Sequence, residues 1–208
     1  MQTKQPFKSI FDRRFYIFLL LLMCMHTRAY TQNTAPGFYI TTTNDSITAQ
    51  IKIPTSLFGS VDLSKLFFKV EILDSITQNS KKFKPGDIKG FGFVYKQISY
   101  SFFSQPTITK NNLRFLQALL LTPETNVYVF KTADQNGVAI GTFYTFERKD
   151  GTYTFLSTGI KNLEKFKETL KEFYKDKAAL QAIIDTKFTS RMAIERDIIT
   201  IAKTANIL

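Results

Sequence analysis

Apolar and polar residues alternate along the first three quarters of the chain. The clearest example is the segment 47–53 (ITAQIKI), in which isoleucine or alanine occupies every second position, the period of a half-buried strand. Turn-forming pairs such as Asn136-Gly137 and Asp150-Gly151 stand between segments of this kind. On these grounds further strands are predicted at 38–42, 66–72 (Leu66, Phe68, Val70 and Ile72 on the apolar face), 81–84, 91–95, 98–102, 127–131, 138–146 and 153–156. The segment 114–121 fits a strand or a buried helical turn, and its neighbour at 127–131 favours a strand.

After Gly159 the apolar residues follow the period of an α-helix. They fall at positions i, i+3, i+7, i+10 and i+11 in Leu163, Phe166, Leu170, Phe173 and Tyr174. The opposite face pairs charges at i+3: Glu164 with Lys167, Glu168 with Lys171, and Glu172 with Lys175. Asp176 is the predicted N-cap of a second helix, and Thr189 or Ser190 of a third. The sequence therefore predicts an α+β fold: an antiparallel β-sheet, or a small barrel-like sheet system, of about 8–10 short strands followed by two or three C-terminal α-helices.

The first 29 residues have the pattern of a secretory signal peptide. Four basic residues precede the apolar run Phe15–Met25, and Ala29 is the expected cleavage site. The run has 11 residues, whereas a membrane-spanning helix needs about 20. Lipidation of Cys24 is a further alternative, but it requires a small residue just before the cysteine, and Met23 stands there. We therefore predict a signal peptide at 1–29, a flexible leader at 30–36 and a single α+β domain at 37–208, with strands in 37–157 and helices in 161–204.

Cleavage after Ala29 would change the chemistry that the chain can carry. It removes five basic side chains and one acidic one, so the net charge falls from +11 to +7. It also removes Cys24 and His26, the only cysteine and histidine, from a chain that has no tryptophan. No thiol nucleophile, imidazole base or ordinary zinc ligand set would remain. No Ser-x-x-Lys, G-x-S-x-G or phosphate-loop motif is present either, and we predict no catalytic residue, cofactor or metal, and no membrane span after cleavage.

The basic residues concentrate in one segment. Lys81, Lys82, Lys84 and Lys89 surround Phe83 and form the densest basic cluster. They are a weak candidate patch for an anionic partner, such as lipopolysaccharide or an acidic glycan. The alternative is a solvated set of lysines that protects a sheet edge. Nucleic acid is not expected as a partner, because export would separate the protein from cellular nucleic acid and no aromatic-basic RNA motif is present.

Three stretches resemble a known group of proteins. They are Gly37-Phe38-Tyr39-Ile40 with the turn that follows, Lys84-Pro85-Gly86-Asp87-Ile88-Lys89-Gly90-Phe91, and the ending around Phe173-Tyr174-Lys175-Asp176 and Asp197-Ile198-Ile199. Together they resemble uncharacterised secreted proteins of Gram-negative bacteria. The resemblance implies a secreted, sheet-rich domain of unknown function with C-terminal helices, and it supplies no catalytic residues.

Three functional hypotheses follow from these observations. The first is an exported, non-enzymatic protein of the periplasm, the outer membrane or the extracellular space, with a binding or structural role. The second is a carrier that holds an apolar ligand in an aromatic-lined cavity of the sheet. It is motivated by the 21 phenylalanines, although core packing accounts for most of them. The third is an exported hydrolase with paired carboxylates, which requires two acidic side chains in one cleft and a raised pKa for one of them.

Overall fold

The computed structural model describes residues 33–56, 59–74, 79–107, 112–133, 139–158 and 163–207. The chain divides into two units, Met1–Gln32 and Asn33–Leu208, and every element below belongs to the second. The predicted signal peptide, Cys24, Ala29 and the first residues of the predicted leader lie outside the described residues. The predicted turn at Asn136-Gly137 also lies outside them.

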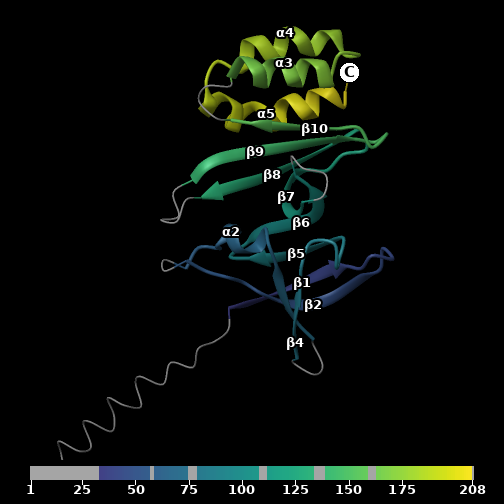
Figure 1. The fold of residues 1–208 in the computed structure, drawn as a ribbon, viewed down its shortest axis with the longest axis vertical. Helices are drawn as coiled ribbons and strands as arrows, with labels where there is room; N and C mark the ends of the chain where they lie inside the picture. Colours follow the sequence, from purple (N-terminus) through teal and green to yellow (C-terminus); the bar gives the residue numbers. More distant parts are fainter. Residues whose placement is uncertain are drawn as a thin grey trace, which may run out of the picture. The chain divides into compact units, whose positions relative to one another are not determined.

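The described strands form one antiparallel sheet, and the predicted α+β fold is confirmed (Figure 1). The sheet has ten strands in the described residues, in the order β10-β9-β8-β7-β6-β5-β1-β2-β3-β4. Every neighbouring pair except β5 and β1 is therefore consecutive along the chain. The strands are β1 Thr34–Ile40, β2 Ser46–Lys52, β3 Val70–Leu73, β4 Ser80–Phe83, β5 Gly90–Tyr95, β6 Ile98–Pro106, β7 Leu113–Leu120, β8 Thr125–Ala133, β9 Ala139–Arg148 and β10 Tyr153–Ser157.

Two hydrophobic cores lie along this sheet. The first, which we call the helix core, is formed where α3 (Leu163–Phe173), α4 (Ala178–Lys187) and α5 (Arg191–Ala205) pack on one face of β7–β10 (Figure 1). It includes Val127, Val129, Tyr144, Phe146 and Leu156 from the strands. The second, the strand core, combines side chains of β1, β2, β3, β5, β6 and β7 with the short helix α2 (Leu63–Leu66). The two cores together bury the apolar faces that the alternating pattern indicates.

The charged and capping side chains of the helices follow the sequence in part. The predicted pairs Glu164–Lys167 and Glu172–Lys175 are present, with nitrogen–oxygen distances of 3.2 and 2.8 Å. Lys171 binds Asp185 of α4, at 2.5 Å, and not Glu168 as predicted. The backbone N–H of Ala193 donates to the Ser190 hydroxyl at 3.2 Å, which confirms the predicted cap of α5.

The predicted N-cap of α4 is wrong. Lys177, and not Asp176, occupies that position, and no side chain caps the helix there. The carboxylate of Asp176 instead forms a bidentate ion pair with Arg148 at the end of β9, with distances of 3.1 and 2.5 Å. A two-pronged pair with a guanidinium binds a carboxylate more strongly than a single backbone N–H does.

The first half of the predicted strand 66–72 is also wrong. Leu63–Leu66 is the helix α2, a turn follows, and β3 begins only at Val70. The Asp62 carboxylate accepts hydrogen bonds from the Ser64 hydroxyl (2.5 Å) and the Lys65 ammonium (3.1 Å), which holds the chain in a helical turn. As a result Phe67 is buried, with 1% of its surface exposed, and Phe68 is 50% exposed. The predicted strand would have turned Phe68 inward.

The sheet begins earlier in the chain than predicted. Thr34–Pro36, within the predicted leader 30–36, pairs with Gln50–Lys52 of β2. The N–H of Ile53 also donates to the carbonyl of Asn33 at 2.6 Å, which extends the pairing by one residue. At the other end of the sheet the predicted Asp150-Gly151 turn joins β9 to β10, and Gly151 has the positive φ of +81° that such a turn requires. Among the described helices, none combines the length and the apolar character needed to cross a membrane.

Candidate functional site

Strands β7 and β8 are paired over only part of their length. In their ladder only Gln117–Leu120 of β7 lies opposite β8, with a register shift after Ala118. The first four residues of β7 and the last four of β8 continue beyond this ladder, so the sheet opens between them. The N–H of Phe115 on β7 does not reach β8; it donates to the carbonyl of Phe67 at 3.0 Å. The turn after α2 therefore enters the opening between the two strands.

Phe67 and Phe68 lie on different sides of this opening. The Phe67 ring packs edge-on against Phe130 of β8 and Phe102 of β6, with centroid distances of 4.9 and 6.3 Å. It belongs to the strand core and closes the opening from the inside. Phe68 lies on the outside. Its ring centroid is 6.5 Å from that of Phe130, and the guanidinium carbon of Arg114 lies over the ring, 4.6 Å from the centroid.

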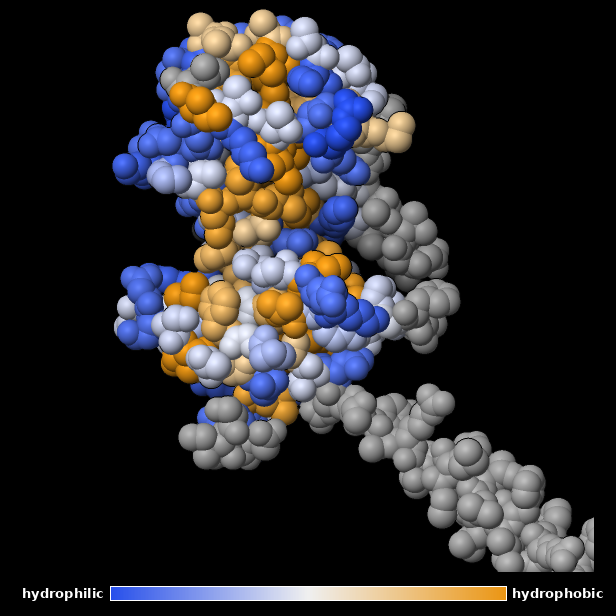
Figure 2. Space-filling view, turned by 180° about the vertical axis from the view of Figure 1, so that it is seen from behind, coloured by the Kyte–Doolittle hydropathy of each residue, from blue (hydrophilic) through white to orange (hydrophobic). Residues whose placement is uncertain are grey.

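A pocket of about 260 Å³ lies at the outer side of the opening. Four phenylalanines and one leucine provide its apolar wall, and three threonines, one asparagine and one arginine provide the remainder. The lining residues are Phe68, Thr107, Asn112, Arg114, Leu116, Phe130, Thr132, Phe143, Thr145 and Phe155. Figure 2 shows hydrophobic side chains gathered around the hollow between the helical part and the lower strands, at the level where β7 and β8 lie in Figure 1.

The strand pleat explains why these side chains gather on one face. Phe130 of β8 lies opposite Phe143 of β9, and Thr145 of β9 lies opposite Phe155 of β10. Residues directly opposite in a ladder point to the same face. Their neighbours in sequence, Val129 and Tyr144 among them, point to the other face and form the helix core. The helices therefore cover one face of β8–β10 and leave the phenylalanine face for the pocket.

Among the described residues of the lining, Arg114 is the only charged one. Its side chain is half-buried, stacks on Phe68, and donates one hydrogen bond to the carbonyl of Leu113 at 2.9 Å. No carboxylate in the described part of the chain lies within ion-pair distance of its guanidinium. A guanidinium carries five N–H donors, so Arg114 retains donors that a bound molecule can use.

A polar cluster lies on the same face of the sheet as the pocket. The hydroxyl of Tyr128 donates to the carboxylate of Glu147 at 3.0 Å, and the amide groups of Asn126 and Gln105 approach the same oxygen at 3.3 and 3.5 Å. Burial, followed by the charge of Glu147, raises the pKa of Tyr128 well above its usual value. Tyr128 therefore remains a neutral hydrogen-bond donor, and the cluster satisfies a partly buried carboxylate with three donors.

The lysines of the basic cluster are exposed but do not converge. Lys81 and Lys82 are neighbours in β4, an edge strand of the described sheet, so their side chains point to opposite faces. The Lys81 ammonium lies over the ring of Phe83, at 4.9 Å. The Lys89 ammonium donates to the side-chain oxygen of Asn44 at 2.6 Å, and Lys84 stands in the turn that follows β4. An anionic partner for these lysines stays a prediction, and their place on an edge strand fits edge protection equally well.

The carboxylates provide no support for the hydrolase hypothesis. That hypothesis requires one carboxyl with a raised pKa beside a second one in a cleft. Every described carboxyl group whose pKa departs clearly from its usual value has a lowered one: Asp62, Glu71, Asp150, Asp176 and Asp197. In the wider, open hollow between β10 and α3, Glu168 and Glu172 stand one turn apart on an exposed helix face, and Glu172 is paired with Lys175.

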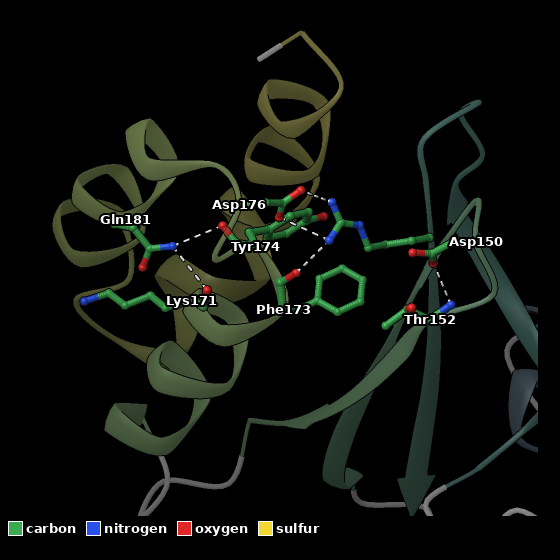
Figure 3. A network of polar contacts seen from close by, with 8 residues as sticks. Asp150, Thr152, Lys171, Phe173, Tyr174, Asp176 and Gln181 are labelled. Carbon is green, nitrogen blue, oxygen red and sulfur yellow. Dashed lines mark hydrogen bonds and ion pairs between the residues drawn. The ribbon is translucent and has the colours of Figure 1, made fainter.

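The network beside this hollow fixes the helices to the sheet. Arg148, at the end of β9, donates hydrogen bonds to the carboxylate of Asp176 at 3.1 Å and to the carbonyl of Phe173 at 3.3 Å (Figure 3). The hydrogen bond from Arg148 lowers the pKa of Asp176. Gln181 of α4 donates to the carbonyls of Lys171 and Tyr174 in the preceding helix and turn, and burial raises the pKa of Tyr174 to about 12. The side chains of Arg148, Asp176 and Gln181 are engaged within this network, which is typical of a structural contact.

Sequence reasoning did not identify the pocket residues. Phe143 and Phe155 occur in predicted strands, but a strand with large residues on both faces does not show which face the helices cover. A signal for Phe68 was present: Leu63, Leu66 and Phe67 follow the i, i+3, i+4 spacing of a helical face after Asp62. A helical turn at this position would place Phe67 on the buried face and Phe68 on the exposed face.

The described residues contain no group of three histidine, cysteine, aspartate or glutamate side chains placed to hold a metal ion. No protein-family model, no curated protein and no solved structure matches the chain. The pocket between β7 and β8 is therefore interpreted from its own geometry.

Proposed function

We propose that this chain is an exported, non-enzymatic binding protein that holds the apolar part of a small molecule in the pocket between β7 and β8. The observation that carries the proposal is the aromatic lining: four phenylalanines and Leu116 face one cavity on the sheet face that the helices leave uncovered. Binding pockets are concave, mainly apolar and equipped with a few polar groups. This pocket has that composition.

The volume limits the size of the bound group. Ligand pockets commonly measure about 300–1,000 Å³, and a cavity of about 150 Å³ holds a benzene molecule. At about 260 Å³ the pocket lies between these values. The apolar group is therefore a single ring or a short chain, and a long acyl chain is too large for it.

Export is supported by the sequence. The basic start, the apolar run Phe15–Met25 and the small residue Ala29 follow the order of a signal peptide. The resemblance to secreted proteins of Gram-negative bacteria agrees with that order. Binding without catalysis is supported by the composition, since no histidine or cysteine follows residue 29. The destination that we propose is the periplasm, the outer membrane or the extracellular space.

The chain's lack of tryptophan makes a specific fluorescence test possible. A Phe68→Trp variant places a single indole at the rim of the pocket, where the native ring is 50% exposed. We expect a set of aromatic and short-chain compounds to contain members that change its emission in a saturable way. The matched control is Phe38→Trp, because Phe38 is 36% exposed on β1 and does not line the pocket. Its emission should not respond.

A second substitution separates binding in the pocket from binding elsewhere. Thr132 lines the pocket and is half-buried, so Thr132→Phe fills part of the space. Added to Phe68→Trp, it should abolish the response or weaken it at least about ten-fold, without loss of the folded state by circular dichroism. An unchanged affinity, an equal response from Phe38→Trp, or no response to any compound would refute the proposal.

A further inference from the structure

The charge that the described residues bring to the pocket lining is positive. Among the ten described residues that line the pocket, Arg114 carries a positive charge and none is an aspartate or glutamate. A cationic ligand would meet an uncompensated like charge in a partly dehydrated site, which is unfavourable. An anionic ligand would meet a guanidinium that no described carboxylate neutralises.

The guanidinium of the lining lies on β7, and three of its four phenylalanines lie on β8, β9 and β10. Thr107 follows β6 and Asn112 precedes β7, and the N–H of Thr107 donates to the carbonyl of Asn112 at 3.0 Å. Arg114, the second residue of β7, follows Asn112 by two positions and also lines the pocket. Phe130, Phe143 and Phe155 come from β8, β9 and β10. The pocket therefore has its guanidinium and its amide near the start of β7 and three phenylalanines across the opening, with Thr132 and Thr145 among them.

The guanidinium of Arg114 is held in a defined orientation. It lies 4.6 Å from the centroid of the Phe68 ring, and its Nη1 donates to the carbonyl of Leu113 in its own strand. Stacking on an aromatic face and a backbone hydrogen bond fix the plane of the group and reduce the entropy lost when it binds a partner. A planar fork of N–H donors matches the two oxygens of a carboxylate.

We infer that the ligand is a small amphipathic carboxylate, whose ring or short chain packs on Phe130, Phe143 and Phe155 while its carboxylate pairs with Arg114. This inference rests on the proposed function and adds the chemical class of the ligand. Thr107 and Asn112 also line the pocket and are neutral polar residues, and the Thr107 hydroxyl donates to the carbonyl of Asn112 at 2.9 Å.

The test compares acids with the alcohols of the same apolar part. Calorimetric titration of the full exported chain uses five matched pairs, from phenylacetate and 3-phenylpropanoate to octanoate, each with its alcohol. We expect at least one acid to bind about ten-fold more tightly than its alcohol, because a hydrogen bond to a charged group contributes that much when its surroundings are partly buried. Binding of the acid should weaken as salt is raised from 0.05 to about 0.5 M, whereas binding of the alcohol should not.

Arg114→Gln and Arg114→Lys provide the matched variants. The glutamine variant should lose the preference for the acid and keep the affinity for the alcohol, and the lysine variant should be intermediate because it keeps the charge but not the fork. The melting temperature of each variant verifies the fold. The preference and the salt dependence of the unmodified protein give the same test without any substitution.

The outcomes distinguish the two proposals. Equal affinity for acid and alcohol, with both bound and both displaced by Thr132→Phe, would overturn the carboxylate inference and leave the proposed function standing. A preference for acids that survives in Arg114→Gln would also overturn the inference. Failure of every acid and every alcohol to bind would overturn both.

Discussion

Alanine substitutions at Phe67 and Phe68, made one at a time, test how the turn after α2 enters the sheet. The two side chains are identical and adjacent in sequence, but the first is 1% exposed and the second 50% exposed. Phe67 contacts the rings of Phe102 and Phe130 inside the strand core. Phe68 contacts Arg114 and one edge of Phe130 at the rim of the pocket. The structure therefore predicts very different costs for the same chemical change.

The expected magnitudes follow from this difference in burial. Removal of a fully buried phenylalanine costs about 3–5 kcal/mol, because it removes apolar contacts and leaves a cavity. For a domain of this size each kcal/mol lowers the melting temperature by about 2–4 °C, so Phe67→Ala should melt about 6–20 °C lower. The Phe68 ring is half in water already, and an exposed cation–π contact contributes about 0.5–1 kcal/mol. Phe68→Ala should therefore cost less than about 1.5 kcal/mol and melt at most about 6 °C lower.

Circular dichroism during heating and urea titration measures both variants. The urea midpoints give the change in the free energy of unfolding, and equal slopes verify that the variants unfold in the same transition. For ligand affinity the order of the two variants should be reversed. Phe68→Ala removes a residue of the pocket lining and should reduce affinity more than Phe67→Ala does. Equal destabilisation by the two substitutions, or a larger loss at Phe68, would refute the placement of Phe67 between β7 and β8.

Three further predictions concern the Arg148–Asp176 ion pair, the N-cap of α5 and the predicted signal peptide. The hydrogen bond and ion pair with Arg148 lower the pKa of Asp176 below that of an ordinary aspartate. The pair therefore stabilises the fold above about pH 4, and this contribution is lost as the pH falls through the lowered pKa. Asp176→Asn should thus be less stable than the unmodified protein by about 0.5–1 kcal/mol at pH 7 and equally stable near pH 2; a difference that persists at pH 2 contradicts the assignment. Ser190→Ala removes the cap of α5 and should cost about 1 kcal/mol in urea titration, and an unchanged midpoint would show that the cap contributes nothing. Mass spectrometry of the exported protein should give a chain that begins immediately after Ala29, with the same mass in a Cys24→Ala variant, whereas a lipidated chain beginning at Cys24 would change.

The regular elements could be predicted because their signals are local. The alternation in 47–53 and the i, i+3, i+7 spacing after Gly159 each depend on neighbours within one element, and both predictions are confirmed. The Ser190 cap is equally local. Asp176 shows the limit of such reasoning, since its position before a helix favours a cap, but Arg148 lies 28 residues away in sequence and binds it instead.

The pocket could not be predicted for a related reason. Its lining comes from four strands, from Thr107 and Asn112 between β6 and β7, and from the turn after α2. The gap that contains it exists because β7 and β8 separate after a few paired residues. No local pattern records where two strands separate. The segment 66–72, which fills the gap, was predicted as a strand, so Phe68 was expected in the core. Arg114 begins the apolar run 114–121, which fits either a strand or a buried helical turn, so the sequence did not show where its side chain points.

The order of the strands also has a consequence for how the chain folds. Most neighbours in the sheet are separated by only a few residues along the chain, so their contacts form between residues close in sequence and incur little loop-closure entropy. The pairing of β1 with β5 is different, since Gly37 meets Phe93 only after the chain has closed a long loop through β2, α2, β3 and β4. We expect the consecutive hairpins from β5 to β10 to form early and to offer β5 as a template. The docking of β1 onto that template, with completion of the strand core, then limits the folding rate.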